Sequence, residues 1–253
     1  HDILVMLHSI LVHTAQQFPG LFPTVKINYP KRERKEMRVL SRDEQEQFVS
    51  FLLEETDKCK FGVLLMLFSG VRIGELCALK WENVDLENGT IIIDRQMQYQ
   101  DGLIKLVSPK TRNSKRTIFL CPTLQEHLKK KFQQRAEDEK QFAELRKQKT
   151  RFIDDLDGRK IPSTDLVNCL PDGTLQTVNS MKYPSREIKA KLGINFKYHF
   201  LRHTYGTLMA EMNTPTHLLC NQMGHASGKV TERYYLAVSK SGIEILQSNL
   251  NQL

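Results

Sequence analysis

Three short strings in the sequence carry residue types that could act on a phosphate group. The first places Arg72 between Gly70 and Gly74, with Glu75 three residues later. Flanking glycines let a ligand approach the backbone closely, and a carboxylate at this spacing could orient the guanidinium toward phosphate oxygens. An arginine here could equally bind the carbonyl groups that end the preceding apolar helix. Taken alone, the string leaves both interpretations open.

The second string contains a histidine and an arginine three residues apart, His199 and Arg202. On a helix, residues at this spacing share a face, so both side chains could converge on one anion. The arginine offers a planar set of donors to phosphate oxygens, and the histidine can donate a hydrogen bond or move a proton. The flanking apolar residues are not metal ligands and no HExxH string occurs, which argues against a metal site. An HxxR string is short enough to arise by chance.

The third string is a Gly-His pair, ending at His225, that is followed by Tyr234 and Tyr235. A tyrosine pair can simply pack into a core. A phenol can instead act as a nucleophile where neighbouring cations stabilise the phenolate, because its ordinary pKa is about 10. Both interpretations stand for this string by itself.

Taken in order along the chain, these strings resemble the catalytic domain of the tyrosine recombinases, the phage-type integrase family. The resemblance runs from about Val39 to Val238. Its four segments are SGVRIGELCALKW at 69–81, SPKTRNSKRTIFL at 108–120, YHFLRHTYGTLM at 198–209 and MGHASGKVTERYY at 223–235. The sequence departs from the family at Phe200, where Asp commonly follows the first histidine, and this departure removes no catalytic group.

The resemblance implies that four residues act on the phosphate that is cut. Arg72 and Arg202 would clamp this scissile phosphate. His225 would donate a hydrogen bond to it, and His199 would handle a proton. Together these groups would offset the charge that develops on the nonbridging oxygens.

The resemblance also implies which groups make and break bonds. Tyr234 would attack and hold the 3′ phosphate covalently, because it lies nine residues after His225 as in the family, and Tyr235 is the alternative. Lys110 would protonate the leaving 5′ oxygen, and Lys115 on the same loop is the alternative. Because the bond is exchanged rather than hydrolysed, no ATP is needed, and the sequence has no P-loop string. We expect no cofactor and no metal, since the fixed cations take the place of a Mg²⁺ pair.

Net charge favours a polyanionic partner. The 253 residues include 37 Lys plus Arg against 29 Asp plus Glu, a formal charge of +8. Many proteins carry such an excess on a solvated face, so charge alone does not identify DNA. With the resemblance, seven basic residues are expected to contact the DNA backbone. They are Lys31, Arg32, Arg34, Lys35, Arg112, Lys115 and Arg116.

The elements that must position these residues are mostly helical. Apolar periodicity and caps predict helices at 2–17, 41–52, 61–68, 75–81, 124–149, 178–192, 201–212 and 216–223. Propensity and turns predict strands at 90–93, 103–107 and 116–120. The expected fold class is mixed α+β and mostly helical: a tyrosine-recombinase catalytic domain with a small antiparallel β-sheet, preceded by a remnant helix of the core-binding domain.

Two packing units are expected, separated by the charge run at 31–36. Residues 1–37 would be the C-terminal helix of a core-binding domain plus a basic linker, and residues 38–253 the catalytic domain. At 241–253 the spacing of apolar residues predicts an amphipathic tail, which could dock on a neighbouring protomer or on its own domain. Because the chain starts with His and holds one such helix, we expect a piece of a longer protein.

The expected function is a site-specific DNA recombinase or integrase of a mobile element or phage. Its partners would be double-stranded DNA and further copies of the chain, with a tetrameric synapse implied by the resemblance. The alternatives are a type IB topoisomerase-like relaxation of DNA and a non-catalytic DNA-binding protein. Five widely spaced cysteines, with no signal peptide and no membrane span, favour a reducing compartment. The expected location is the cytoplasm of a bacterium, at the nucleoid, with the protein encoded by the bacterium, a phage or a mobile element.

Overall fold

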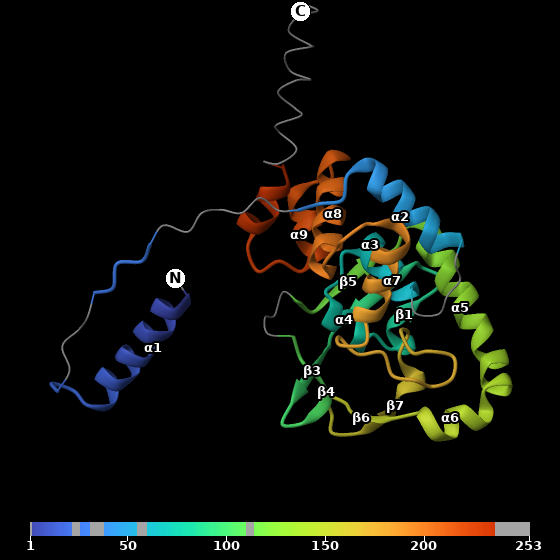
Figure 1. Cartoon of the computed structure of the whole chain (residues 1–253), viewed down its shortest axis with the longest axis horizontal. Helices are drawn as coiled ribbons and strands as arrows, with labels where there is room; N and C mark the ends of the chain where they lie inside the picture. Colours follow the sequence, from blue (N-terminus) through green and yellow to red (C-terminus); the bar gives the residue numbers. More distant parts are fainter. Residues whose placement is uncertain (1, 22–25, 31–37, 55–59, 110–113, 236–253) are drawn as a thin grey trace, which may run out of the picture. The chain divides into compact units, whose positions relative to one another are not determined.

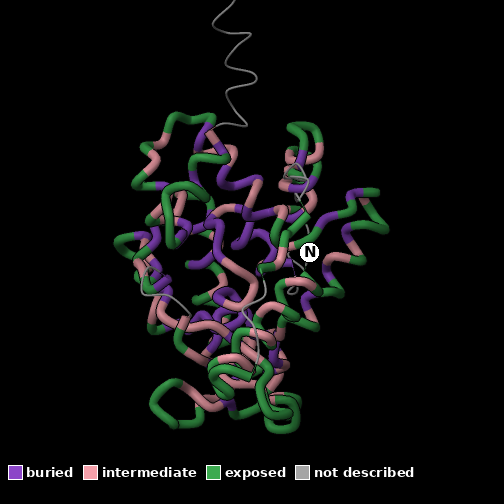
Figure 2. The backbone as a smooth tube through the Cα atoms, turned by 90° about the vertical axis from the view of Figure 1, so that its left-hand side faces the viewer, coloured by how far each residue is buried: buried purple, intermediate pink, exposed green. Residues whose placement is uncertain are grey.

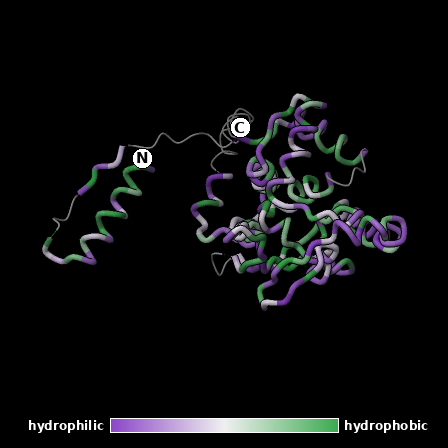
Figure 3. The backbone as a smooth tube through the Cα atoms, turned by 60° about the horizontal axis from the view of Figure 1, so that its bottom comes forward, coloured by the Kyte–Doolittle hydropathy of each residue, from purple (hydrophilic) through white to green (hydrophobic). Residues whose placement is uncertain are grey.

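The structure is a computed structural model, and it describes residues 2–21, 26–30, 38–54, 60–109 and 114–235. The chain divides into two compact units, residues 1–37 and 38–253. The first unit holds helix α1 (Asp2–Gln17), which is labelled in Figure 1. None of the residues of this helix is buried. Figure 3 shows hydrophobic stretches of backbone along this helix. Its Ile3, Met6 and Ile10 side chains are exposed. The origin of this unit in a core-binding domain stays a prediction.

The second unit is built around one apolar helix. Helix α3 (Phe61–Ser69) buries nearly every side chain because its sequence has no polar face. It packs against α2 (Arg42–Glu54), α4 (Ile73–Ala78), α5 (Pro122–Gln141) and α8 (Tyr198–Glu211). Figure 2 shows the buried residues gathered in the middle of this unit. The remaining helices are α6 (Ala143–Lys149), α7 (Lys182–Leu192) and α9 (Thr216–Met223), with 3-10 turns η1 (Trp81–Asn83) and η3 (Ser163–Asp165).

Two small sheets replace the single antiparallel sheet that the sequence predicts. The first has the order β1-β2-β5, from β1 (Val84–Asp85), β2 (Thr90–Ile93) and β5 (Arg116–Phe119), and is antiparallel. The second has the order β3-β4-β6-β7, from β3 (Gln96–Gln100), β4 (Leu103–Val107), β6 (Phe152–Asp154) and β7 (Lys160–Pro162). Its β4 and β6 run parallel. The three predicted strands form as β2, β4 and β5, and β1, β3, β6 and β7 come in addition.

Two predicted helices break several residues before the ends that their patterns indicate. The helix expected at 75–81 ends at Ala78, because the chain then pairs with a distant segment: the backbone N–H of Val167 donates to the Leu79 carbonyl at 2.8 Å. The helix expected at 124–149 is divided into α5 and α6 by Phe142, whose ψ of 19° is not helical. In both places a local change of backbone direction ends the helix that the apolar spacing predicts.

Candidate active site

Arg202 lies on α8, is 2% exposed, and joins the ends of two other helices. Its Nη1 donates to the carbonyl of Gly70, and its Nη2 donates to the carbonyl of Met223. Burial, together with the charge of Arg72, lowers the pKa of Arg202 to about 9, so the guanidinium stays charged at neutral pH. These two carbonyls carry the negative ends of the α3 and α9 dipoles, which suits a buried cation.

Glycine is required where these two helices end. Gly70 and Gly224 adopt left-handed conformations with φ of 65° and 63°. A Cβ atom on Gly70 would lie 2.4 Å from the Tyr205 ring, and one on Gly224 would lie 2.8 Å from Nη1 of Arg116. The backbone can therefore turn sharply enough to bring both helix ends to Arg202.

Arg72 reaches the same turn from the start of α4. Its Nη2 donates to the Gly224 carbonyl at 2.9 Å, and its Nη1 lies 2.7 Å from Oε1 of Glu75. Glu75 also accepts the backbone N–H of Arg72 at 2.9 Å. The carboxylate orients the arginine as the spacing predicts, but the carbonyl that Arg72 binds ends α9 and not the preceding apolar helix, whose Gly70 carbonyl accepts from Arg202. A role of Arg72 on phosphate stays a prediction. Unlike Arg202, the Arg72 side chain is 38% exposed and can reach a ligand.

Glu75 is held from its other side by Arg116. Nη2 and Nη1 of Arg116 lie 2.9 and 3.1 Å from the two carboxylate oxygens, and its Nε donates to the Gln222 carbonyl at 2.9 Å. Burial raises the pKa of Glu75, but Arg116 and Arg72 outweigh it, so the pKa is lowered and the carboxyl is ionised. The Arg116 side chain is 5% exposed. Arg116 was expected to contact the DNA backbone, whereas its donors face into the site.

Two histidines occupy neighbouring turns of α8. The rings of His199 and His203 meet edge to face at 4.2 Å, as residues four apart on a helix can. Burial lowers the pKa of His199, and the charges of Arg202 and Arg72 add to this. His203 is absent from the predicted site; its spacing from His199 places it on the same helix face but does not by itself assign it a role. Its Nδ1 lies 3.0 Å from the hydroxyl oxygen of Tyr234.

Tyr234 lies inside the site and is 1% exposed. Its ring stacks on the His225 ring at 6.0 Å and 15°, and lies beside Gly206, where a Cβ atom would come within 2.8 Å of Cζ. Burial raises the pKa of Tyr234, while the charges of Arg202 and Arg72 act in the opposite direction.

Tyr235 faces a different part of the second unit. Its hydroxyl donates to the backbone carbonyl of Thr214. The geometry thus favours Tyr234 over Tyr235 as the nucleophile, and this assignment stays a prediction.

His225 is buried and oriented by a neighbouring hydroxyl. Its Nδ1 lies 2.8 Å from Oγ1 of Thr231, which is fully buried. Burial lowers the pKa of His225 to about 3, and the nearby arginines Arg202, Arg72 and Arg116 contribute. The ring is therefore neutral at neutral pH and can donate one hydrogen bond to a phosphate oxygen.

Most of the predicted basic residues lie outside the described part of the chain. Lys115 is described and exposed. The predicted basic residues that lie outside the described part are Lys31, Arg32, Arg34, Lys35, Lys110 and Arg112. The predicted amphipathic tail also falls there.

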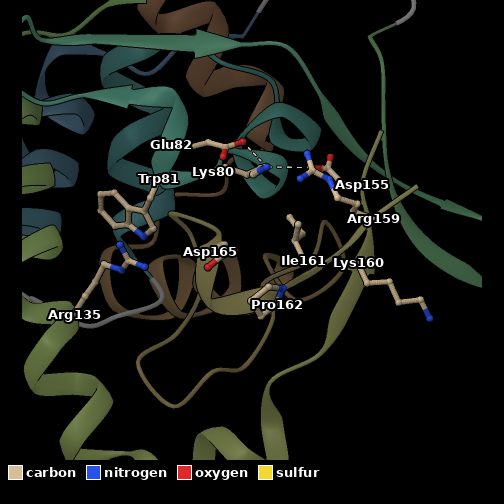
Figure 4. A pocket seen from close by; sticks show the side chains of 10 residues that line it. All are labelled: Lys80, Trp81, Glu82, Arg135, Asp155, Arg159, Lys160, Ile161, Pro162 and Asp165. Atoms are coloured by element: carbon tan, nitrogen blue, oxygen red, sulfur yellow. Dashed lines mark hydrogen bonds and ion pairs between the residues drawn. The ribbon is translucent and has the colours of Figure 1, made fainter. Parts of the chain in front are cut away.

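A separate hollow of about 450 Å³ opens beside η1 and β7 (Figure 4). Lys80 there forms ion pairs with Glu82 and, at 3.1 Å, with Asp155. Arg95 also pairs with Asp155, at 2.7 Å. These contacts join η1 and the end of β2 to the β6–β7 turn. None of the residues predicted for catalysis lines this hollow. The ion pairs of Lys80, Arg95 and Asp155 therefore serve to hold these elements together.

No cluster of three or more His, Cys, Asp or Glu side chains is arranged to bind a metal ion among residues that the structure describes. Likewise, no described helix combines the length and the apolar character that crossing a membrane requires.

Known proteins resemble this chain in sequence. The model of the phage integrase family matches residues 38–241. A XerC-like tyrosine recombinase of Caldanaerobacter subterraneus is 28% identical over 189 residues, which are 69% of this chain and 44% of the relative. The integrase of Staphylococcus phage L54a is 27% identical over 233 residues, 88% of this chain and 62% of the relative. The chain thus spans about half the length of these curated relatives.

Solved structures share the fold. The Tn1549 transposon integrase, in complex with transposon right end DNA, gives a TM-score of 0.69 at 20% identity, covering 95% of this chain and 77% of that one. The XerH site-specific recombinase, bound to a palindromic difH substrate, gives 0.65 at 22% identity, covering 96% and 65%. The expected fold class is confirmed by these likenesses.

Proposed function

Because the chain belongs to the phage integrase family, we propose that it cuts and rejoins DNA at specific sites through a covalent 3′-phosphotyrosine intermediate. The observation that carries this proposal is the buried Tyr234, whose ring shares one site with Arg72, Arg202 and His225. A phenol buried near two guanidinium groups suits an attack on a phosphodiester. The comparisons do not favour relaxation of DNA by a topoisomerase or a non-catalytic role.

The two arginines would divide the work on the phosphate. Arg202 is fixed by two backbone carbonyls and supplies an immobile positive charge. Arg72 is more exposed and held by Glu75, so it would contact the nonbridging oxygens directly. Preorganised donors of this kind are each worth about 10² to 10³ in rate, because they need no rearrangement as charge develops.

Bond exchange would need a nucleophile and an acid. The oxygen of Tyr234 attacks phosphorus while the bond to the 5′ oxygen breaks, and Lys110 supplies a proton to that leaving oxygen. General acid assistance is typically worth about 10² to 10⁴ in rate. Lys115, exposed on the same loop, is the alternative donor.

Double-stranded DNA and further copies of this chain are the proposed partners. The Tn1549 integrase structure holds transposon right end DNA and the XerH structure holds a palindromic difH substrate, which supports DNA as the partner here. Apart from Arg116, the basic residues predicted to bind the backbone would position the duplex and make affinity depend on salt. The proposed location is the bacterial cytoplasm.

Assembly of several copies would use the C-terminal tail. An apolar groove of about 490 Å³ opens between β5, α8 and α9, and Phe119, Leu218 and Leu219 are among its lining residues. The tail has apolar residues at helical spacing in 241–253, so we propose that the tail of a neighbouring copy fills this groove. Truncation after Ser239 should then abolish DNA synapsis in a gel-shift assay. Undiminished synapsis would reject the proposal.

The catalytic proposal is tested with a nicked suicide duplex that carries the cognate site. The wild-type chain should form a covalent protein–DNA adduct, and Tyr234→Phe should form none, because phenylalanine lacks the nucleophilic oxygen. Absence of an adduct with the wild type would overturn the mechanism. An adduct that persists in Tyr234→Phe would overturn the assignment of the nucleophile. Relaxation of supercoils without exchange between two sites would indicate a topoisomerase.

A further inference from the structure

The hydroxyl of the proposed nucleophile hydrogen-bonds a histidine outside the predicted set. We propose that His203 accepts the proton of the Tyr234 hydroxyl when this oxygen attacks the phosphate. The inference rests on the proposed function, and it adds a residue to that site. Nδ1 of His203 is 3.0 Å from the hydroxyl oxygen, a normal hydrogen-bond length for proton transfer.

The histidine implied by the family resemblance lies one turn away. The His199 and His203 rings lie on the same side of α8, and their centroids are 4.2 Å apart. Within the described part of the chain, no other side chain hydrogen-bonds the Tyr234 hydroxyl. His225 also faces the tyrosine ring, but its Nδ1 is engaged by Thr231. The geometry therefore separates the two tasks: His203 faces the attacking oxygen, and His199 remains free to act on the phosphate.

The protonation state suits an acceptor. If Nδ1 accepts from the phenol, the single ring proton lies on Nε2. Burial lowers the pKa of His203 to about 4, and the charges of His199 and Arg202 contribute, so the ring is neutral at neutral pH. The pKa of His203 should rise when a negatively charged phosphate enters the site, because an adjacent anion stabilises the imidazolium.

The proton and electron balance is complete. The Tyr234 oxygen forms a bond to phosphorus, its proton moves to Nδ1 of His203, and the bond between phosphorus and the 5′ oxygen breaks. The electron pair of that bond stays on the 5′ oxygen, which is protonated by Lys110 under the proposed function. In rejoining, the 5′ hydroxyl attacks, the phenolate leaves, and His203 returns the proton to it.

Two variants separate proton transfer from positioning. In His203→Asn the side-chain oxygen can accept the phenol hydrogen bond but cannot be protonated, whereas His203→Ala removes both capacities. Adduct formation on the suicide duplex should slow by about 10² to 10⁴ in both variants. Added imidazole should restore part of the rate to His203→Ala. If His203→Asn cleaves as fast as the wild type, His203 only positions the hydroxyl and the proposal is overturned.

The pH profile gives an independent readout. The groups that face His203 are His199 and Arg202 on its own helix and Tyr234 from the C-terminal segment, and burial acts on it as well. Wild-type cleavage should be nearly flat between about pH 6 and pH 9, because the acceptor is already neutral. His203→Asn should gain about tenfold per pH unit, since hydroxide must then remove the phenol proton. A flat profile in the variant would contradict proton acceptance.

Controls distinguish this inference from the proposed function. His217 is exposed on α9, so His217→Asn should cleave like the wild type. Circular dichroism and gel shifts should show that the His203 variants fold and bind DNA. A substrate whose 5′ oxygen is replaced by sulphur needs no acid, so it should not rescue His203→Asn. Full rescue would place His203 on the leaving group and refute the proposal, whereas a wild type without any adduct would refute the proposed function itself.

Discussion

Replacing Glu75 by Gln should reduce stability and activity together, because this carboxylate holds two arginines. Glu75 is 2% exposed, and its oxygens lie 2.9 and 3.1 Å from Arg116 and 2.7 Å from Nη1 of Arg72. Glutamine has nearly the same shape but offers one acceptor and no charge. The two guanidinium groups would then share a buried site without their counter-charge.

The expected loss of stability follows from the burial of the pair. Removing one partner of a buried ion pair typically costs about 3 to 5 kcal/mol. We expect about 3 kcal/mol, roughly a 100-fold change in the folding equilibrium, because water still reaches part of Arg72. Arg116 also keeps hydrogen bonds to the carbonyls of Gln222 and Ser114.

The loss should depend on pH in a defined direction. The pKa of Glu75 is lowered in the folded chain from its ordinary value of 4.5. Stabilisation by the ionised carboxyl is therefore complete above this ordinary value and disappears as the pH falls through the lower folded-state pKa. The difference in unfolding free energy between wild type and Glu75→Gln should be constant above about pH 6 and shrink in acid.

Urea unfolding at neutral and acid pH measures this difference, and the suicide-duplex assay measures cleavage. Glu82→Gln is the matched control, because Glu82 pairs with Lys80 but its side chain is 62% exposed, and such pairs contribute less than about 1 kcal/mol. If Glu75→Gln unfolds within about 0.5 kcal/mol of the wild type at pH 7, as surface substitutions do, the reasoning on the buried pair fails.

Three further predictions concern single residues. Gly70→Ala should lower the unfolding free energy by about 1 to 3 kcal/mol, because φ is 65° and Cβ would lie 2.4 Å from the Tyr205 ring; an unchanged thermal midpoint would contradict this. Tyr235→Phe should still form the covalent adduct while losing about 1 kcal/mol with its hydrogen bond to Thr214; loss of the adduct in a well-folded variant would reassign the nucleophile. Burial raises the pKa of Cys77 to about 12, so native-state alkylation at pH 8 should leave this thiol unmodified by mass spectrometry, and rapid labelling would show that α4 opens.

The elements with strong local patterns could be predicted from the sequence. The apolar run at 61–68 indicated the central helix, and the β-branched run at 90–93 indicated β2. Strands β6 and β7 could not be found this way, because each is three residues long; β6 also pairs with β4, which is distant in sequence, and β7 pairs with β6 alone. The single apolar period at 124–149 likewise gave no sign of the break at Phe142.

In the site, sequence reasoning selected residue types but could not give their directions. Arg116 is one basic residue among several near Lys110, and its inward turn depends on Glu75, which lies 41 residues earlier. The role proposed for His203 depends on its contact with Tyr234, which lies 31 residues later, so helix spacing alone could not assign this role. Such contacts between distant segments form when the chain packs, and no local pattern contains them.

Arg202 has a consequence for the control of DNA cutting. Its guanidinium is bonded to the residues that end α3 and α9, which are separated by some 150 positions in the chain. A copy in which either helix end has come loose loses the support of its central cation at the same moment. Under the proposed function, damage at either helix end would therefore also disable DNA cutting, and the cell would meet an inert protein rather than an indiscriminate nuclease.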